Sequence, residues 1–105
     1  MVKLVALYKK PEDEAAFMQH YNGVHTPLVK KIPGLRKLEI THLSGSPMGE
    51  APWFLMAEMY YDSMDAMNSA NASPEGKATA RDLMSFAIKH VTMVFGEVKE
   101  TESTK

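Results

Sequence analysis

The stretch Trp53-Phe-Leu-Met-Ala-Glu-Met-Tyr-Tyr61 decides the fold of this chain, because its apolar run is interrupted by a single charged residue. A nearly continuous apolar run of this length predicts a central strand whose sheet is covered on both faces. Residues 2–9 carry the same signal, since apolar side chains alternate onto both faces of that segment. Residues 35–43 alternate cleanly between apolar and polar, which predicts an edge strand with one solvated face. Residues 91–98 complete the set of predicted strands.

The segment between the first two strands is predicted to be helical. Pro11 and the acidic residues after it are helix start signals, and we expect a helix over about residues 12–31. Asn22-Gly23 weakens this helix, and Thr26-Pro27 can begin a fresh turn with Thr26 as its N-cap. The helix is therefore expected to bend or break between these two pairs of residues.

The second helical segment lies between the last two strands. A helix over about residues 64–71 is expected to restart at Ser73, which can cap a following helix over about residues 74–88. The resulting order, β-α-β-β-α-β, matches the ferredoxin-like unit, an α+β fold in which a four-stranded antiparallel sheet carries its helices on one face. We expect a single domain over residues 1–98, followed by a polar tail over residues 99–105.

The other face of this sheet would remain apolar, since Val5, Leu7 and most of residues 53–61 offer side chains to it. An exposed apolar sheet of that size predicts an association surface. A second copy packed sheet against sheet, as a two-fold homodimer, would cover it.

Composition excludes several classes of function. Among 105 residues, twelve Lys and Arg balance thirteen Asp and Glu, so no basic excess exists to bind nucleic acid. Cysteine is absent, which excludes disulfides, thiolate nucleophiles and Cys-ligated metals. Without a signal-peptide pattern or a membrane-spanning apolar run, we expect a cytoplasmic protein.

Candidate chemistry gathers in the first helical segment. Its apolar stripe places Phe17, Tyr21, Val24 and Leu28 inward, with His20 and His25 on the two borders of the stripe. In a functional interpretation, His25 or His20 is a general acid/base, Tyr21 orients a substrate oxygen, and substrate contacts come from Phe17, Val24 and Leu28. In the structural alternative, the histidines bond to backbone carbonyls and Tyr21 only packs.

A metal site is not expected, because the helical two-histidine signature needs a spacing of four residues and His20 and His25 are five apart. His42 and His90 fall on opposite edges of the predicted sheet. Asp82 is expected on a solvated helix face or as a cap partner, rather than in a site.

Several segments together resemble the EthD family, a branch of the dimeric α/β-barrel superfamily. The similarity runs over about residues 2–98 and is carried by the opening strand, Phe17-x-x-His20-Tyr21-x-x-x-His25-x-Pro27-Leu28, Ile32-Pro33-Gly34-Leu35, Ser73-Pro74-Glu75-Gly76 and Asp82. The resemblance implies the ferredoxin-like dimer, with His20, Tyr21 and His25 as the characteristic polar residues. It also implies a part in the oxidative breakdown of small organic molecules, beside an oxygenase partner and in an undefined role.

Three hypotheses of function follow. The first is an enzyme without a cofactor that acts on a small hydrophobic or aromatic molecule in the helix–sheet cleft. Histidine acid/base chemistry would make it an oxidoreductase of the monooxygenase type, or else an isomerase or dehydratase. The second is a non-catalytic accessory protein that binds such a ligand for a partner oxygenase. The third, haem binding or haem degradation, is implied only by kinship within the superfamily.

Overall fold

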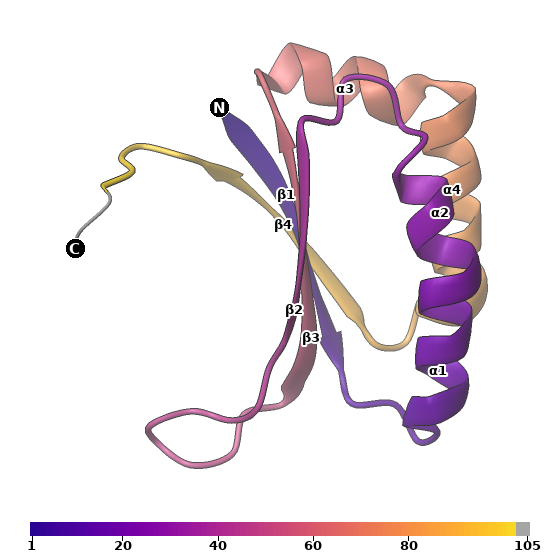
Figure 1. The fold of residues 1–105 in the computed structure, drawn as a ribbon, viewed down its shortest axis with the longest axis vertical. Coiled ribbons are helices and arrows are strands. Elements are labelled where there is room, and N and C mark those ends of the chain that lie inside the picture. The colour runs from indigo at the N-terminus through magenta and orange to yellow at the C-terminus, as the bar shows by residue number, and fades with distance from the viewer. Residues whose placement is uncertain (103–105) are drawn as a thin grey trace.

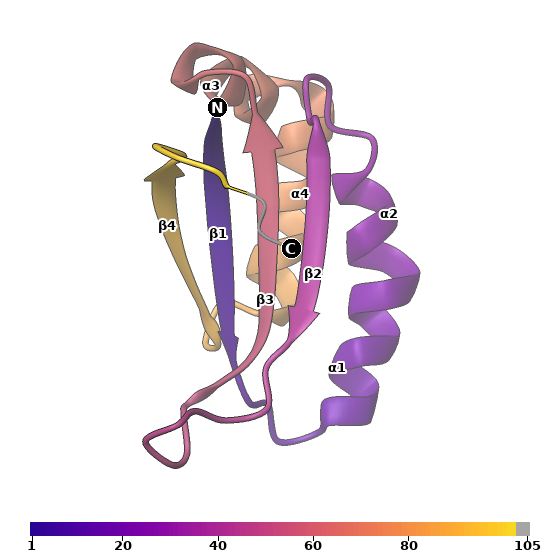
Figure 2. The same cartoon turned by 60° about the vertical axis from the view of Figure 1, so that its left-hand side comes forward.

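The computed structural model describes residues 1–102 and shows one antiparallel sheet with helices on one side of it (Figure 1). The strands are β1 (Val2–Lys9), β2 (Lys37–His42), β3 (Trp53–Tyr61) and β4 (Val91–Glu97), in the order β2-β3-β1-β4 across the sheet (Figure 2). The helical elements are α1 (Glu14–His20), η1 (Tyr21–His25), α2 (Thr26–Val29), α3 (Met64–Ala72) and α4 (Pro74–Phe86). The predicted α+β, ferredoxin-like βαββαβ arrangement is confirmed, with β2 at an edge and β3 and β1 in the centre. The predicted tail over residues 99–105 falls partly outside the described residues.

The register between β1 and β3 builds the core. Ala6 pairs with Ala57 and Tyr8 with Leu55, and each of these four residues is at most 3% exposed on the helix side of the sheet. Because side chains alternate along a strand, the intervening residues face away from the helices. Each of the two strands thus supplies alternate residues to the core on the helix side and to the opposite face of the sheet.

The first helical segment is continuous, but its middle is a π-helix rather than a break. Asp13 caps the start, since its Oδ1 accepts a hydrogen bond from the Ala16 N–H at 3.0 Å. In the π turn, the N–H of Thr26 donates to the carbonyl of Tyr21, five residues earlier. Thr26 has helical backbone angles of −59° and −43°, so its expected role as an N-cap is wrong. At Asn22-Gly23, where the sequence disfavours an α-helix, the helix therefore continues through one wider turn instead of breaking.

The second helical segment restarts where the sequence predicts. Ser73 separates α3 from α4, and its Oγ accepts from the N–H of Gly76 at 3.0 Å. Glycine is required at position 76, because a Cβ there would collide with the backbone carbonyl of Ala70. This close approach lets the start of α4 pack directly against the end of α3.

The sheet face away from the helices carries apolar and paired charged side chains. Val94 is 46% exposed, while Val5, Leu7 and Met56 are half-buried beside it. Glu58 lies among them, 7% exposed, and binds the Lys3 ammonium at 2.6 Å. We call this surface the outer sheet face.

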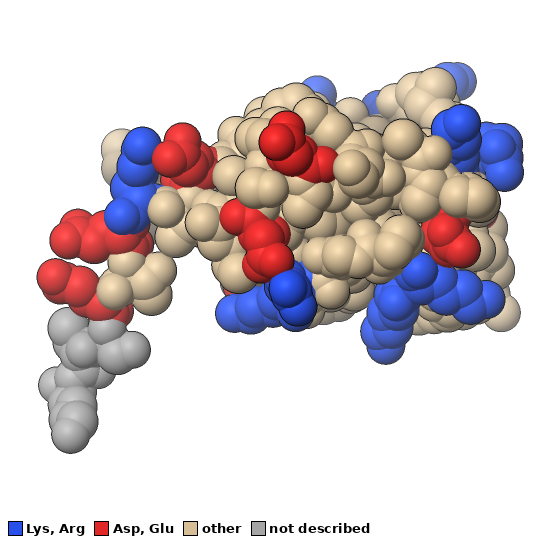
Figure 3. Space-filling view, turned by 90° about the horizontal axis from the view of Figure 1, so that it is seen from above, with Lys and Arg blue, Asp and Glu red and all other residues tan. Residues whose placement is uncertain are grey.

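Charged side chains of both signs are scattered over the face of the molecule that is seen from above (Figure 3). In the view from above, acidic and basic side chains alternate with uncharged surface, and neither sign forms a large patch (Figure 3). Among the described residues, no helix has the length and apolar character needed to cross a bilayer.

Candidate functional site

The two histidines of the first helical segment meet at one carboxylate. His20 Nε2 lies 2.8 Å from Asp82 Oδ1, and His25 Nδ1 lies 2.9 Å from Asp82 Oδ2. The π turn explains this convergence, because a turn that closes over five residues brings positions 20 and 25 to the same side of the helix. A carboxylate only accepts hydrogen bonds, so with Asp82 ionised each facing ring nitrogen carries the proton.

Asp82 is the functional residue that sequence reasoning misplaced. Its side chain is only 12% exposed and lies between the two imidazoles, so the expectation of a solvated face or a helix cap is wrong. The available signal was its position on α4, three residues after buried Thr79 and four residues before Phe86. That spacing puts Asp82 on the inward side of the helix.

His25 is the buried member of the pair, with 4% of its surface exposed. Burial lowers the pKa of His25 below its usual value, and the hydrogen bond and charge of Asp82 oppose that effect only in part. Asp82 occupies Nδ1, so Nε2 is the nitrogen left for other contacts. His25 therefore offers an unprotonated nitrogen held in a fixed orientation.

His20 occupies the more open position. Its side chain is 34% exposed and contributes to a surface hollow between the start of α1 and the end of α4, where Pro11, Phe17 and His90 also lie. The three side chains therefore form a chain of contacts from this surface hollow, through Asp82, to buried His25.

Aromatic rings enclose this chain of contacts. The Phe86 ring lies 4.5 Å from the His20 ring and 5.1 Å from the His25 ring, measured between centroids. Tyr21 packs 5.6 Å from His25 and 5.5 Å from Tyr8. Burial raises the pKa of Tyr21 to about 12, and burial together with the neighbouring Tyr21 raises the pKa of Tyr8. Both phenols thus remain protonated near neutral pH, so each can donate its hydrogen while its oxygen can also accept a hydrogen bond.

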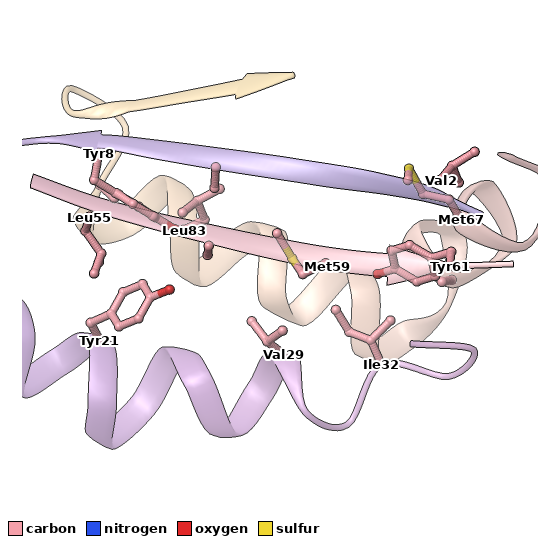
Figure 4. Close-up of a cluster of buried hydrophobic side chains, with 14 of the residues drawn as sticks. Val2, Tyr8, Tyr21, Val29, Ile32, Leu55, Met59, Tyr61, Met67 and Leu83 are labelled. Atoms are coloured by element: carbon pink, nitrogen blue, oxygen red, sulfur yellow. The ribbon is translucent and has the colours of Figure 1, made fainter. Parts of the chain in front are cut away.

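A cavity of about 340 Å³ lies between the sheet and the helices, and His25 forms part of its wall. Its size is at the lower end of the usual range for small-molecule sites. Figure 4 shows part of the buried core, in which Tyr8, Val29, Ile32, Met59, Tyr61 and Leu83 belong to the cavity wall. The lining is mostly apolar and comprises Leu4, Ala6, Tyr8, His25, Val29, Ile32, Met59, Tyr61, Asn71, Gly76, Thr79, Ala80, Leu83, Met93 and Phe95.

The structure gathers some of the predicted site residues and separates others. Tyr21 lies beside His25, and Phe17 packs in the aromatic cluster around it. Val24 is 44% exposed, so its predicted place on the inward stripe is wrong, because the π turn moves the buried positions to His25 and Val29.

Leu28 is half-buried outside the main cavity, in a shallow hollow against the start of α4. Tyr8 and Tyr61, which sequence reasoning did not select, do line the cavity. Their signal was inward alternation on two central strands, which packing alone also explains.

Within residues 1–102, no group of three or more His, Cys, Asp and Glu side chains is arranged to hold a metal ion. The ring nitrogens that face one another across Asp82 are each engaged by its carboxylate.

Comparison with known proteins gives a consistent set of relatives. The EthD domain model matches residues 9–90. An uncharacterized 11.0 kDa protein from the thcB–thcC intergenic region of Rhodococcus erythropolis is 36% identical over 98 residues, covering 90% of this chain and 92% of that protein.

Solved structures extend the comparison. The crystal structure of an EthD family protein from Bacillus halodurans C-125 is 51% identical, with a TM-score of 0.90 over 93% of this chain and 98% of that one. SnoaB, a cofactor-independent oxygenase from Streptomyces nogalater, shares the fold at 15% identity, with a TM-score of 0.70 over 95% of this chain and 94% of that one.

Proposed function

Because this chain belongs to the EthD family, we propose that it takes part in the degradation of a small hydrophobic or aromatic molecule, which it binds in the helix–sheet cavity and from which His25 removes a proton. The observation that carries this proposal is the His25–Asp82 contact of 2.9 Å at the wall of a largely apolar cavity. A base held by a carboxylate beside an apolar space is suited to abstracting a proton from a bound organic molecule.

The proton transfer uses the two nitrogens of His25 differently. Nε2 accepts a proton from a C–H or O–H group of the ligand, which leaves the bonding electron pair on the ligand as an enolate or phenolate. The positive charge then on His25 is stabilised by the Asp82 carboxylate at Nδ1. The lowered pKa of His25 keeps the imidazole neutral, and so available as a base, near pH 7.

His20 completes the route for the proton. It contacts the second oxygen of Asp82 and borders the surface hollow, so it can exchange protons with solvent while His25 stays enclosed. In this proposal His25 is the catalytic residue, whereas Asp82 and His20 act through it as positioning residues. Tyr21 holds the imidazole in place by packing against its ring.

Hydrogen exchange at a model carbon acid tests the proposal. Acetophenone dissolved in D₂O should exchange its methyl protons faster with the wild-type protein than with His25→Gln, as followed by proton NMR. His42→Gln is the matched control, since His42 is an exposed histidine at the end of β2, and it should keep the wild-type rate. Equal rates for wild type and His25→Gln would remove the histidine mechanism.

A second candidate is an accessory protein that binds a ligand and leaves the chemistry to a partner oxygenase. The mostly apolar lining favours it, because such a cavity binds small molecules without needing a base. Saturable acetophenone binding without any catalysed exchange would support this candidate over proton transfer.

The same proposal includes a homodimer formed through the outer sheet face. Val5, Leu7, Met56 and Val94 give this face an apolar centre that no helix of the described chain covers (Figure 2). A second copy related by a two-fold axis would bury it. Light scattering should give about twice the chain mass of 11.7 kDa, and a monomer mass at micromolar concentration would contradict the dimer.

A further inference from the structure

Tyr61 carries a polar group that the protein itself does not satisfy. The residue is 0% exposed, and its hydroxyl has no hydrogen-bond partner among residues 1–102. Leaving a buried hydroxyl unpaired costs stability, so such groups are rare in folded proteins unless something else satisfies them.

The unpaired hydroxyl belongs to a residue of the cavity wall. Tyr61 lines the cavity, and its ring projects from the end of β3 with the hydroxyl pointing toward Met59, which also lines it (Figure 4). His25, another lining residue, follows Tyr21 by one turn of the same helical segment. Further polar groups are added to the lining by Tyr8, Asn71 and Thr79. The Tyr61 hydroxyl is the one among these groups that is buried without a partner in the described chain. Because Tyr61 ends β3 and His25 belongs to the helical segment, the two would contact different parts of an occupant.

The lack of charged side chains in the described cavity lining limits the kind of molecule that can bind there. No Lys, Arg, Asp or Glu side chain contributes to the described lining, and His25 is kept neutral by burial near pH 7. A charged ligand would lose its hydration without meeting a counter-ion, which is strongly unfavourable. The middle of the space is formed by aliphatic and thioether groups such as Leu4, Val29 and Met59.

From this arrangement, and resting on the proposed function, we propose that Tyr61 selects the ligand: an uncharged, mostly apolar organic molecule whose carbonyl or similar oxygen accepts a hydrogen bond from the Tyr61 hydroxyl. Burial raises the pKa of Tyr61, so the phenol remains a donor throughout the neutral range. The oxygen of the ligand satisfies the orphan hydroxyl, while its apolar body occupies the space beside Met59 and places another part of the molecule at His25.

Two probes that differ in a single atom group test the assignment. Acetophenone has a carbonyl where 2-phenylpropene, of nearly the same shape, has a methylene. Binding is followed by NMR of the methionine methyl groups, because Met59 and Met93 both line the cavity. Wild-type protein should bind acetophenone more tightly than 2-phenylpropene.

Tyr61→Phe should weaken acetophenone binding roughly tenfold and leave 2-phenylpropene binding within about twofold of wild type. Tyr60→Phe is the matched control, since Tyr60 is the preceding residue on β3 and its ring lies near Lys3 and Lys37 on the outer sheet face. That control should change neither affinity.

The outcomes separate this inference from the function it rests on. If both probes shift the Met59 and Met93 signals equally well in wild type and in Tyr61→Phe, the cavity binds small molecules but Tyr61 does not select them, and the inference is overturned. If neither probe shifts these signals, ligand binding in the cavity and the inference both fail. If Tyr61→Phe does not fold, equal affinity of the wild type for the two probes still overturns the inference.

Discussion

The two faces of the sheet differ in whether their polar side chains have partners within the protein. On the outer sheet face, Glu58 binds Lys3 at 2.6 Å, and the Tyr60 ring lies about equally near the ammonium groups of Lys3 and Lys37, at 5.3 and 5.1 Å. On the inner face, the Tyr61 hydroxyl has no partner in the described chain, and His25 keeps one nitrogen free of Asp82.

Tyr60 and Tyr61 express this difference most directly, because they are neighbours of the same residue type on β3. Alternation along the strand sends one to each face. The outer tyrosine finds its partners within the protein, whereas the inner one faces a cavity. Satisfied polar groups favour a structural or assembly role, whereas a buried unpaired hydroxyl on a cavity wall is a group that a bound molecule could satisfy.

The largest effect is expected from a substitution that disrupts association through the outer sheet face. Val5→Asp puts a carboxylate opposite Glu58, with which Val5 is paired in the β1–β3 register. Like charges brought together in an interface cost several kcal/mol, so the proposed dimer should dissociate to monomers at micromolar concentration. Light scattering measures the change.

Val24→Asp provides the control, because Val24 is 44% exposed on the helical side, and this variant should remain dimeric. The methyl signals of Met59 and Met93 should keep their positions in both variants. A Val5→Asp protein that stays dimeric would show that the outer sheet face is not the interface.

The next largest effect is expected from removing the carboxylate that binds the two histidines. Asp82→Ala leaves the buried Nδ1 of His25 without its partner, and unpaired buried polar groups cost about 1–3 kcal/mol. Urea unfolding should show a loss of that size in the free energy of unfolding. Arg81→Ala, at the exposed preceding position of α4, should stay within about 0.5 kcal/mol of wild type. Equal stability of the two variants would argue against the Asp82 contacts.

A pH series sharpens the contrast further. The pKa of His25 in the folded state lies below its unfolded value of 6.5, so the unfolded chain takes up a proton first as pH falls. The stability associated with neutral His25 is complete above pH 6.5 and is lost as pH falls through the lowered folded pKa. The melting temperature of the wild type should therefore fall more steeply than that of His25→Gln as pH drops below 6.5. Parallel curves would mean that burial does not perturb this group.

The fold could be predicted because its signals are local and repeated. The double-sided run at residues 53–61 defines a central strand, the alternation at residues 35–43 defines an edge, and Ser73 caps α4 as expected. Each of these depends on periodicity or on one side chain bonding to its own backbone.

The site could be predicted only in part, because its geometry depends on one irregular turn. An ordinary helix places His20 and His25 on opposite borders of the stripe, whereas the π turn brings them to the same side. Nothing in the spacing of Asn22-Gly23 distinguishes a widened turn from a break. Asp82 is also 57 residues from His25 in the chain, so only the packing of α4 could reveal their contact.

The smallest expected effect separates the two neighbouring tyrosines by stability alone, in the absence of ligand. Tyr61→Phe removes a hydroxyl that has no partner in the described chain, so it should leave the free energy of unfolding unchanged or raise it by up to about 1 kcal/mol. Tyr60→Phe keeps the ring that faces Lys3 and Lys37, and should change the same quantity by less than about 0.5 kcal/mol. Urea unfolding of both variants at one protein concentration provides the measurement. A loss of about 1 kcal/mol or more in Tyr61→Phe would mean that the inner hydroxyl is already satisfied without a ligand, and the contrast between the two faces would then no longer indicate a binding site.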